Sequence, residues 1–122
     1  MRQKIVAGNW KMNLDINQGK TLLSEILDSN INKDILTIIA PPTIHLNSFN
    51  QMLSHTSISL AAQNCHQQDA GAYTGEISVG MLKSVGVEYV ILGHSERREY
   101  FMEDSLSLSF KVMNVIKHGL RP

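Results

Sequence analysis

The stretch Ile35-Leu36-Thr37-Ile38-Ile39-Ala40 indicates the fold class, because it is almost continuously apolar and rich in β-branched side chains. A strand of this kind is buried on both faces, which is typical of parallel sheets that helices cover on their faces. Pro41 and Pro42 follow directly and stop the run. We therefore expect a buried strand in an α/β protein at this point of the chain.

Similar runs occur on either side of this strand, and they alternate with helical patterns. Further strands are predicted at residues 5–8, 58–62 and 87–93, and helical patterns cover residues 15–28, 46–53, 78–85 and 105–118. Asp15 and Gln18 form a predicted capping box at the first helix, Ser78 is a predicted N-cap, and Gly86 and Gly119 are predicted helix stops. Four β-then-α units in a row predict a parallel sheet joined by right-handed crossovers.

The last helical pattern carries two apolar stripes that lie next to each other. The main stripe consists of Leu106, Phe110, Met113 and Ile116, and the neighbouring one of Leu108, Val112 and Val115. An amphipathic helix of a globular protein turns its apolar stripe towards the core. The pattern thus predicts a helix that packs on the sheet.

Composition and charge exclude several function classes. The chain has 122 residues, 43% of them apolar, and 11 basic against 11 acidic side chains leave a formal charge of zero. Binding to nucleic acid or to an anionic membrane surface through bulk charge is therefore disfavoured. No signal peptide or membrane-length apolar run is expected, and Cys65 has no disulfide partner. We predict a cytoplasmic protein.

Polar side chains follow three of the four predicted strands at their carboxyl ends, and a proline follows the fourth. The residues are Asn9 and Lys11, Pro41, Gln63 and Asn64, and His94 and Ser95. In parallel α/β folds, whether open sheets or barrels, ligands bind at this edge of the sheet. We expect these residues to converge at one mouth.

Two of these positions suggest specific chemistry. Lys11 can bind a phosphate or carboxylate as a point charge, with Asn9 as a hydrogen-bonding amide beside it, although both types are also common in solvated turns. A helix N-terminus next to His94 would favour a neutral imidazole that donates to a carbonyl. The other histidines, His45, His55, His66 and His118, are interpreted as structural, and no spacing indicates a metal site.

The turn after His94 is dense in charge. Glu96 and Glu103 flank Arg97 and Arg98, an arrangement that predicts internal ion pairs with a supporting role. Trp10 is expected to pack beneath its loop, and Cys65 to be a small, partly buried thiol.

Four segments of this chain, in this order, resemble signature segments of one enzyme family, triosephosphate isomerase. They are Asn9-Trp10-Lys11-Met12-Asn13, Ala62-Gln63-Asn64, Ala72-Tyr73-Thr74-Gly75-Glu76-Ile77-Ser78 and Gly93-His94-Ser95-Glu96-Arg97-Arg98. The resemblance implies a (β/α)₈ barrel that interconverts dihydroxyacetone phosphate and D-glyceraldehyde 3-phosphate in glycolysis and gluconeogenesis without a cofactor. In this family a glutamate base works with a neutral histidine electrophile and a closing loop.

The resemblance also implies roles for individual residues. Lys11 would bind the substrate phosphate and the enediolate charge, Asn9 would bind substrate beside it, and His94 would polarise the carbonyl. Ser95 and Glu96 would support the site. Thr74, Gly75 and Glu76 would belong to a loop that reaches the partner subunit of a homodimer, with Met12 and Asn13 near the pocket that receives it.

Two departures from the family pattern have consequences. Met102 stands before Glu103 where the family usually has glycine, which affects the expected turn geometry. A complete barrel takes about 250 residues, so residues 1–122 are interpreted as the N-terminal half of the barrel, truncated before the fifth strand. The family's glutamate base and lid belong to the other half, so we expect negligible activity from this chain alone, and self-association or loose packing.

Two alternatives remain open at this point. One is a small, complete α/β binding module of the flavodoxin or receiver type, which the chain length suits but which lacks acidic residues after the first strand. The other is a non-catalytic fragment that binds full-length isomerase subunits through the Thr74 loop and its open sheet edges.

Overall fold

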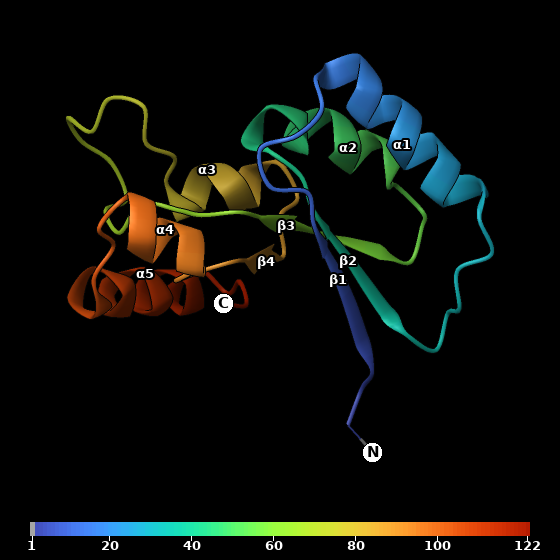
Figure 1. The fold of residues 1–122 in the computed structure, drawn as a ribbon. Coiled ribbons are helices and arrows are strands. Elements are labelled where there is room, and N and C mark those ends of the chain that lie inside the picture. Colours follow the sequence, from blue (N-terminus) through green and yellow to red (C-terminus); the bar gives the residue numbers. More distant parts are fainter. Residues whose placement is uncertain (1) are drawn as a thin grey trace.

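The computed structural model describes residues 2–122 and shows one sheet of four parallel strands in the order β1-β2-β3-β4 (Figure 1). The strands are β1 (Ile5–Asn9), β2 (Leu36–Ala40), β3 (Ile58–Ala62) and β4 (Tyr89–Val90). The helices are α1 (Ile16–Asp28), the 3₁₀ turn η1 (Thr43–His45), α2 (Leu46–Met52), α3 (Val79–Ser84), α4 (Ser95–Tyr100) and α5 (Ser105–Lys117). The predicted α/β fold with parallel strands is confirmed.

The order of the strands distinguishes between the two architectures considered for this chain. Each strand pairs with the next one along the chain, and β1 lies at an edge. A flavodoxin-like sheet has the order 2-1-3-4-5, in which the first strand is internal. The flavodoxin or receiver interpretation is therefore wrong, and the sequential order is that of a half-barrel.

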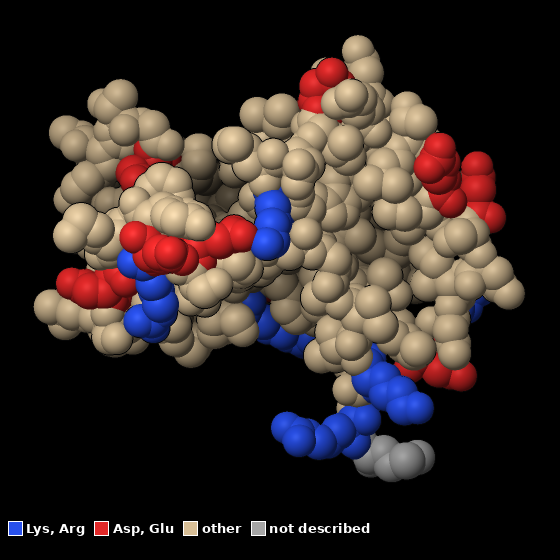
Figure 2. Space-filling view, in the orientation of Figure 1, with Lys and Arg blue, Asp and Glu red and all other residues tan. Residues whose placement is uncertain are grey.

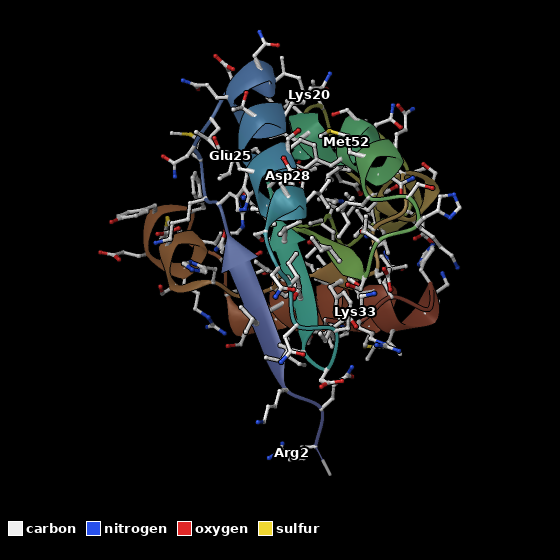
Figure 3. All side chains as sticks on the ribbon, turned by 90° about the vertical axis from the view of Figure 1, so that its right-hand side faces the viewer. Arg2, Lys20, Glu25, Asp28, Lys33 and Met52 are labelled. Atoms are coloured by element: carbon white, nitrogen blue, oxygen red, sulfur yellow. The ribbon has the colours of Figure 1, made fainter. Side chains whose placement is uncertain are left out.

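Helices cover one face of the sheet and leave the other thinly covered. Leu23 of α1, Phe49 of α2 and Val115 of α5 share one buried cluster with residues of the sheet such as Ile39 and Leu60. Figure 3 shows α1, which carries Lys20, Glu25 and Asp28, beside α2, which ends at Met52. The opposite face holds only a small buried cluster of Ile38, Ala40 and Ala61. The main core therefore lies between the sheet and its helices.

The inner strands and the edge strands differ in their burial. All five residues of β3 are buried, whereas four of the five in β1 are exposed, including Ile5 and Val6. β4 is also shorter than the predicted strand at 87–93. Its ladder with β3 extends over two residue pairs, and on its outer edge Tyr89 forms a single parallel bridge with Arg121.

Local signals in the sequence account for the ends of several helices. Asp15 accepts hydrogen bonds from the N–H groups of Asn17 and Gln18, and the Gln18 side chain accepts the Asp15 N–H, which confirms the capping box. Ser78 accepts the Met81 N–H at the start of α3. Gly86, just after α3, has φ +81°, a conformation that glycine adopts at no steric cost.

The prediction for the main stripe of the last helix is wrong. Leu106, Phe110, Met113 and Ile116 are 50–66% exposed. The neighbouring stripe packs inward instead through Leu108 and Val115, and Lys111 and Asn114 are buried beside it. α5 thus buries two polar residues beside two apolar ones and leaves its main apolar stripe outward, because part of the surface below it is charged and polar.

Candidate active site

The carboxyl ends of the strands meet at one cleft of about 340 Å³. Asn9, Lys11, Gln63, Asn64, His94 and Glu96 line it, together with Met12, Thr43, Cys65, Gly75, Glu76, Ile77, Arg97 and Phe101. Figure 2 shows this side of the molecule hollowed, with both signs of charge dispersed over the surface. The polar strand-end residues therefore converge, although Pro41 and Ser95 do not line the cleft, and positions up to 92 residues apart, Asn9 and Phe101, share it.

Lys11 lies in a strained but well-supported backbone conformation. Its φ of +55° is in the left-handed region, which costs an L-amino acid about 1–2 kcal/mol. Its N–H donates to Oδ1 of Asn9 over 2.9 Å, and its carbonyl accepts from Nε2 of Gln63 over 2.8 Å. The same Gln63 nitrogen donates to the carbonyl of Ala40, also over 2.8 Å. Gln63 therefore fastens the Lys11 loop to the ends of β2 and β3.

The imidazole of His94 is held in one tautomer. Gly93, three residues after β4, has φ +67°, and the turn that it makes leads to His94 as the N-cap of α4. Nδ1 of His94 accepts the N–H of Glu96 over 3.3 Å, which assigns the ring proton to Nε2. Nδ1 also lies 3.5 Å from Oε2 of Glu96. The side chain presents an N–H donor at Nε2.

An ion pair links Lys11 to Glu96 across the mouth. Nζ of Lys11 donates to Oε1 of Glu96 over 2.7 Å, and this hydrogen bond is the main reason why the pKa of Glu96 is lowered. Both side chains are largely exposed, and ion pairs of this kind contribute about 0–1 kcal/mol. Two N–H bonds of the ammonium remain for a ligand. Glu96 thus positions the Lys11 side chain, which stays accessible to a ligand.

A buried charge cluster supports the cleft from below. The carboxylate of Glu103 is 4% exposed, forms an ion pair with Nζ of Lys111, and lies 3.4 Å from Nε of Arg97. The Arg97 contact is too poorly aligned for a hydrogen bond, so we describe it as a charge contact. Lys111 also donates to Oδ1 of Asn64 over 3.0 Å. The predicted ion pair of Arg97 and Glu103 exists, and α5 adds a cation that the pattern did not indicate.

The remaining residues predicted from the sequence either pack inside the protein or lie at its surface. Trp10 packs edge-on against Phe49 with ring centroids 5.4 Å apart, as expected of a packing residue. Cys65 is fully buried, and this burial raises the pKa of its thiol to about 11. Ser95 and Thr74 are exposed and do not line the cleft, whereas Gly75 and Glu76 do.

The position where the sequence departs from the family pattern is also strained. Met102 has φ +53°, which glycine adopts freely and which costs methionine free energy. A glycine would therefore fit this backbone conformation at lower cost.

Within residues 2–122 no three His, Cys, Asp or Glu side chains gather as a metal site would require. None of the helices there is both long and apolar enough to cross a membrane.

A sequentially wound parallel β/α sheet with a lysine, an amide and a histidine at its mouth is typical of one half of a (β/α)-barrel. Within this class, the sequence matches the triosephosphate isomerase family over residues 4–122. The chain belongs to the triosephosphate isomerase family.

Individual relatives agree with this assignment. The chain is 51% identical over 121 residues to the triosephosphate isomerase of Flavobacterium psychrophilum, and that match covers 98% of the chain and 48% of the relative. It is 45% identical to the enzyme of Alkaliphilus oremlandii and 44% identical to that of Clostridium novyi, in each case over 49% of the relative. The chain thus spans about half the length of the curated relatives it matches.

Proposed function

We propose that the whole protein to which this chain corresponds is a triosephosphate isomerase. It would interconvert dihydroxyacetone phosphate and D-glyceraldehyde 3-phosphate in the cytoplasm, in glycolysis and gluconeogenesis. The observation that carries this proposal is that the His94 imidazole and the Lys11 ammonium line one cleft. An N–H donor and a cation in one site match a substrate with a carbonyl and a phosphate.

The reaction needs a proton to move between two adjacent carbons through an enediolate. His94 would donate a hydrogen bond to the carbonyl oxygen and stabilise the charge that develops on it. Lys11 would bind the anionic substrate, with the Asn9 amide beside it. Ser95 and Glu96 would support the site, because Glu96 orients Lys11 and its N–H fixes the tautomer of His94. A neutral histidine electrophile is the known arrangement of this family.

The general base is not assigned to a residue of this chain. The two carboxylates that line the cleft are Glu76 and Glu96, and Glu96 is engaged by Lys11. A base has to lie within hydrogen-bond reach of the proton that it abstracts. We therefore predict that residues 1–122 bind substrate weakly and turn it over negligibly.

The test measures ligand binding and turnover separately. Titration of the chain with dihydroxyacetone phosphate, followed by NMR of the His94 ring, should shift the Nε2 resonance. Lys11→Met should weaken binding about tenfold or more, which corresponds to about 1.4 kcal/mol. Lys117→Met, at an exposed lysine outside the cleft, is the matched control. Absence of binding, or turnover near that of a full-length relative, would contradict the proposal.

We also propose that the whole protein is a homodimer and that the loop around Thr74 is its interdigitating segment. Thr74, Gly75 and Glu76 are exposed, and a Cβ on Gly75 would have no heavy atom within 4 Å. The base of the loop is anchored, since the N–H of His66 donates to the carbonyl of Ile77 over 2.9 Å. An anchored loop with an open tip is suited to insertion into a neighbour. Deletion of residues 73–75 in a full-length relative should yield monomers in sedimentation, and a persisting dimer would exclude this role.

A further inference from the structure

The short loop from Lys11 to Leu14, which carries the lysine of the cleft, is strained at both ends. Lys11 has φ +55° and Leu14 has φ +72°, so a residue other than glycine lies in the left-handed region at each end. Such conformations persist only where surrounding contacts hold them in place. Asn9 and Gln63 fasten the Lys11 end of the loop. The Leu14 end therefore needs a contact of its own.

That contact comes from a fully buried histidine. His45 ends the 3₁₀ turn η1 just before α2, and its Nε2 lies 3.0 Å from the carbonyl oxygen of Leu14. Because a carbonyl oxygen only accepts hydrogen bonds, Nε2 carries a proton and donates it to this bond. The segment between β1 and α1 passes beside the start of α2 (Figure 1), and this hydrogen bond joins the two. Side chains thus fasten the Lys11–Leu14 loop at both ends.

The surroundings of the His45 ring fix its orientation. The ring stacks on Phe49 with centroids 5.0 Å apart, and Trp10 lies edge-on to it at 6.3 Å. On the side of α1 the ring meets Gly19, where a Cβ would come within 2.7 Å of Cε1 of His45. Glycine inside a helix is less favourable than alanine, so Gly19 has a packing reason to be there. The aromatic neighbours and the glycine together direct Nε2 at the Leu14 carbonyl.

Packing alone does not account for a histidine at position 45. Its other ring nitrogen, Nδ1, is buried and has no hydrogen-bond partner within residues 2–122. Buried polar atoms are normally paired, because an unpaired one keeps the full cost of its desolvation. An apolar ring would fill the same space without this cost. The hydrogen bond from Nε2 to the loop is what the histidine adds.

We propose that His45 is a positioning residue for Lys11. It acts through the carbonyl of Leu14: the hydrogen bond holds the end of the Lys11–Leu14 loop, and the loop holds the Lys11 ammonium at the cleft. A residue outside the cleft thereby contributes to binding of the anionic group of the substrate. This contribution to binding rests on the proposed function, whereas the control of the loop can be measured without any ligand.

Two amide variants separate the hydrogen bond from the packing of the ring. The amide nitrogen of glutamine lies as many bonds from Cβ as Nε2 of histidine does, and that of asparagine lies one bond closer. His45→Gln can therefore still donate to the Leu14 carbonyl, whereas His45→Asn is too short. We expect His45→Asn to speed hydrogen exchange of the Lys11 N–H by about tenfold or more, and His45→Gln to stay within about threefold of the parent chain.

The N–H of Glu88 is the reference in the same spectra. It donates to the carbonyl of Leu60 over 2.9 Å beside the amino end of β4, whereas the Lys11 loop lies at the carboxyl ends of the strands. A merely structural role of His45 would speed exchange of both amides through global unfolding, and a positioning role speeds that of Lys11 alone. The dissociation constant for dihydroxyacetone phosphate should rise about fivefold in His45→Asn and return close to the parent value in His45→Gln.

A second variant leaves the histidine in place and moves its ring. Gly19→Ala puts a methyl group against Cε1 of His45, so the Lys11 N–H should again exchange faster, by about fivefold or more. Gly80→Ala in α3 is the matched control, since a Cβ there would meet no atom closer than 3.9 Å. We expect the control to change the exchange rate less than about twofold.

Four results would overturn the proposal: unchanged exchange of the Lys11 N–H in His45→Asn, equal acceleration of the Lys11 and Glu88 amides, equal effects of His45→Asn and His45→Gln, or unchanged affinity of His45→Asn for dihydroxyacetone phosphate. A parent chain that does not bind this ligand but shows the expected exchange pattern would support the control of the loop by His45 while contradicting the proposed isomerase function. The two proposals can therefore fail independently.

Discussion

α1 and α5 are both helices of 13 residues with apolar residues at helical spacing, yet they bury different kinds of side chain. α1 buries Leu23 completely, and Ile26 and Leu27 pack partly against the same cluster. α5 buries Lys111 and Asn114 beside Leu108 and Val115, and it leaves its main apolar stripe in solvent.

The difference follows from what lies under each helix. α1 lies on the apolar side chains of β2 and α2, so its apolar face gains free energy by burial. α5 lies over Glu103 and Asn64, whose oxygens need donors, and Lys111 supplies them. Helical periodicity thus identifies the apolar face of a helix, whereas the groups around the helix decide which face is buried.

The largest effect is expected where α5 buries charge. Lys111→Met should destabilise the chain by about 3–5 kcal/mol, because it leaves the buried Glu103 carboxylate with only the poorly aligned contact to Arg97. Urea unfolding measures the change. Lys117→Met on the same helix is the control, and its exposed ion pair with Asp69 should contribute less than about 1 kcal/mol. Equal losses in the free energy of unfolding would show that the buried Lys111 contributes no more to stability than the exposed Lys117.

A second test compares apolar residues of the two helices. Leu23→Ala in α1 should cost about 2–5 kcal/mol through lost burial and a cavity. Met113→Ala in α5 should change the free energy of unfolding by less than about 0.5 kcal/mol, since this side chain is already in solvent. If Met113→Ala cost as much as Leu23→Ala in the monomer, the described orientation of α5 would be wrong.

The loops before the two helices offer a smaller test. Left-handed residues other than glycine occur in both, Lys11 and Leu14 before α1 and Met102 before α5. Met102→Gly should stabilise the chain by about 0.5–1 kcal/mol, because the strain that it removes slightly exceeds the entropy that glycine loses on folding. Thermal unfolding should show a higher midpoint, and a lower one would mean that the methionine side chain contributes contacts that outweigh the strain.

The smallest expected effect is on the pH dependence of stability in acid. Asp104 caps α5 and its pKa is lowered, chiefly by the hydrogen bond from the Ser107 N–H. A group with a lower pKa in the folded state stabilises the fold above its unfolded pKa, near 4, and loses that contribution as the pH falls through the folded value. Asp104→Asn keeps a capping oxygen but does not titrate, so the urea midpoint should fall less steeply below about pH 4. An unchanged slope would exclude this contribution.

Much of the fold and the mouth of the site could be predicted from local patterns. Strand runs, the capping box of Asp15 and the glycine at position 86 depend on neighbouring residues, and each appears as expected. Asn9, Lys11 and His94 were placed at one edge because the carboxyl ends of parallel strands always meet. The support around them was not predicted: Gln63 fastens Lys11, and Lys111 reaches Asn64 from 47 residues away.

The sequence by itself determined the α/β class, the parallel sheet, the family and the group of residues at the mouth, since these follow from periodicity, helix caps and motifs over short spans. Only the tertiary structure decided that β1 lies at the edge of the sheet, that α5 faces its main stripe outward and that Nδ1 of His94 accepts the Glu96 N–H. The physical reason is that strand order, burial and tautomer depend on partners that are distant in sequence, and no local pattern contains them.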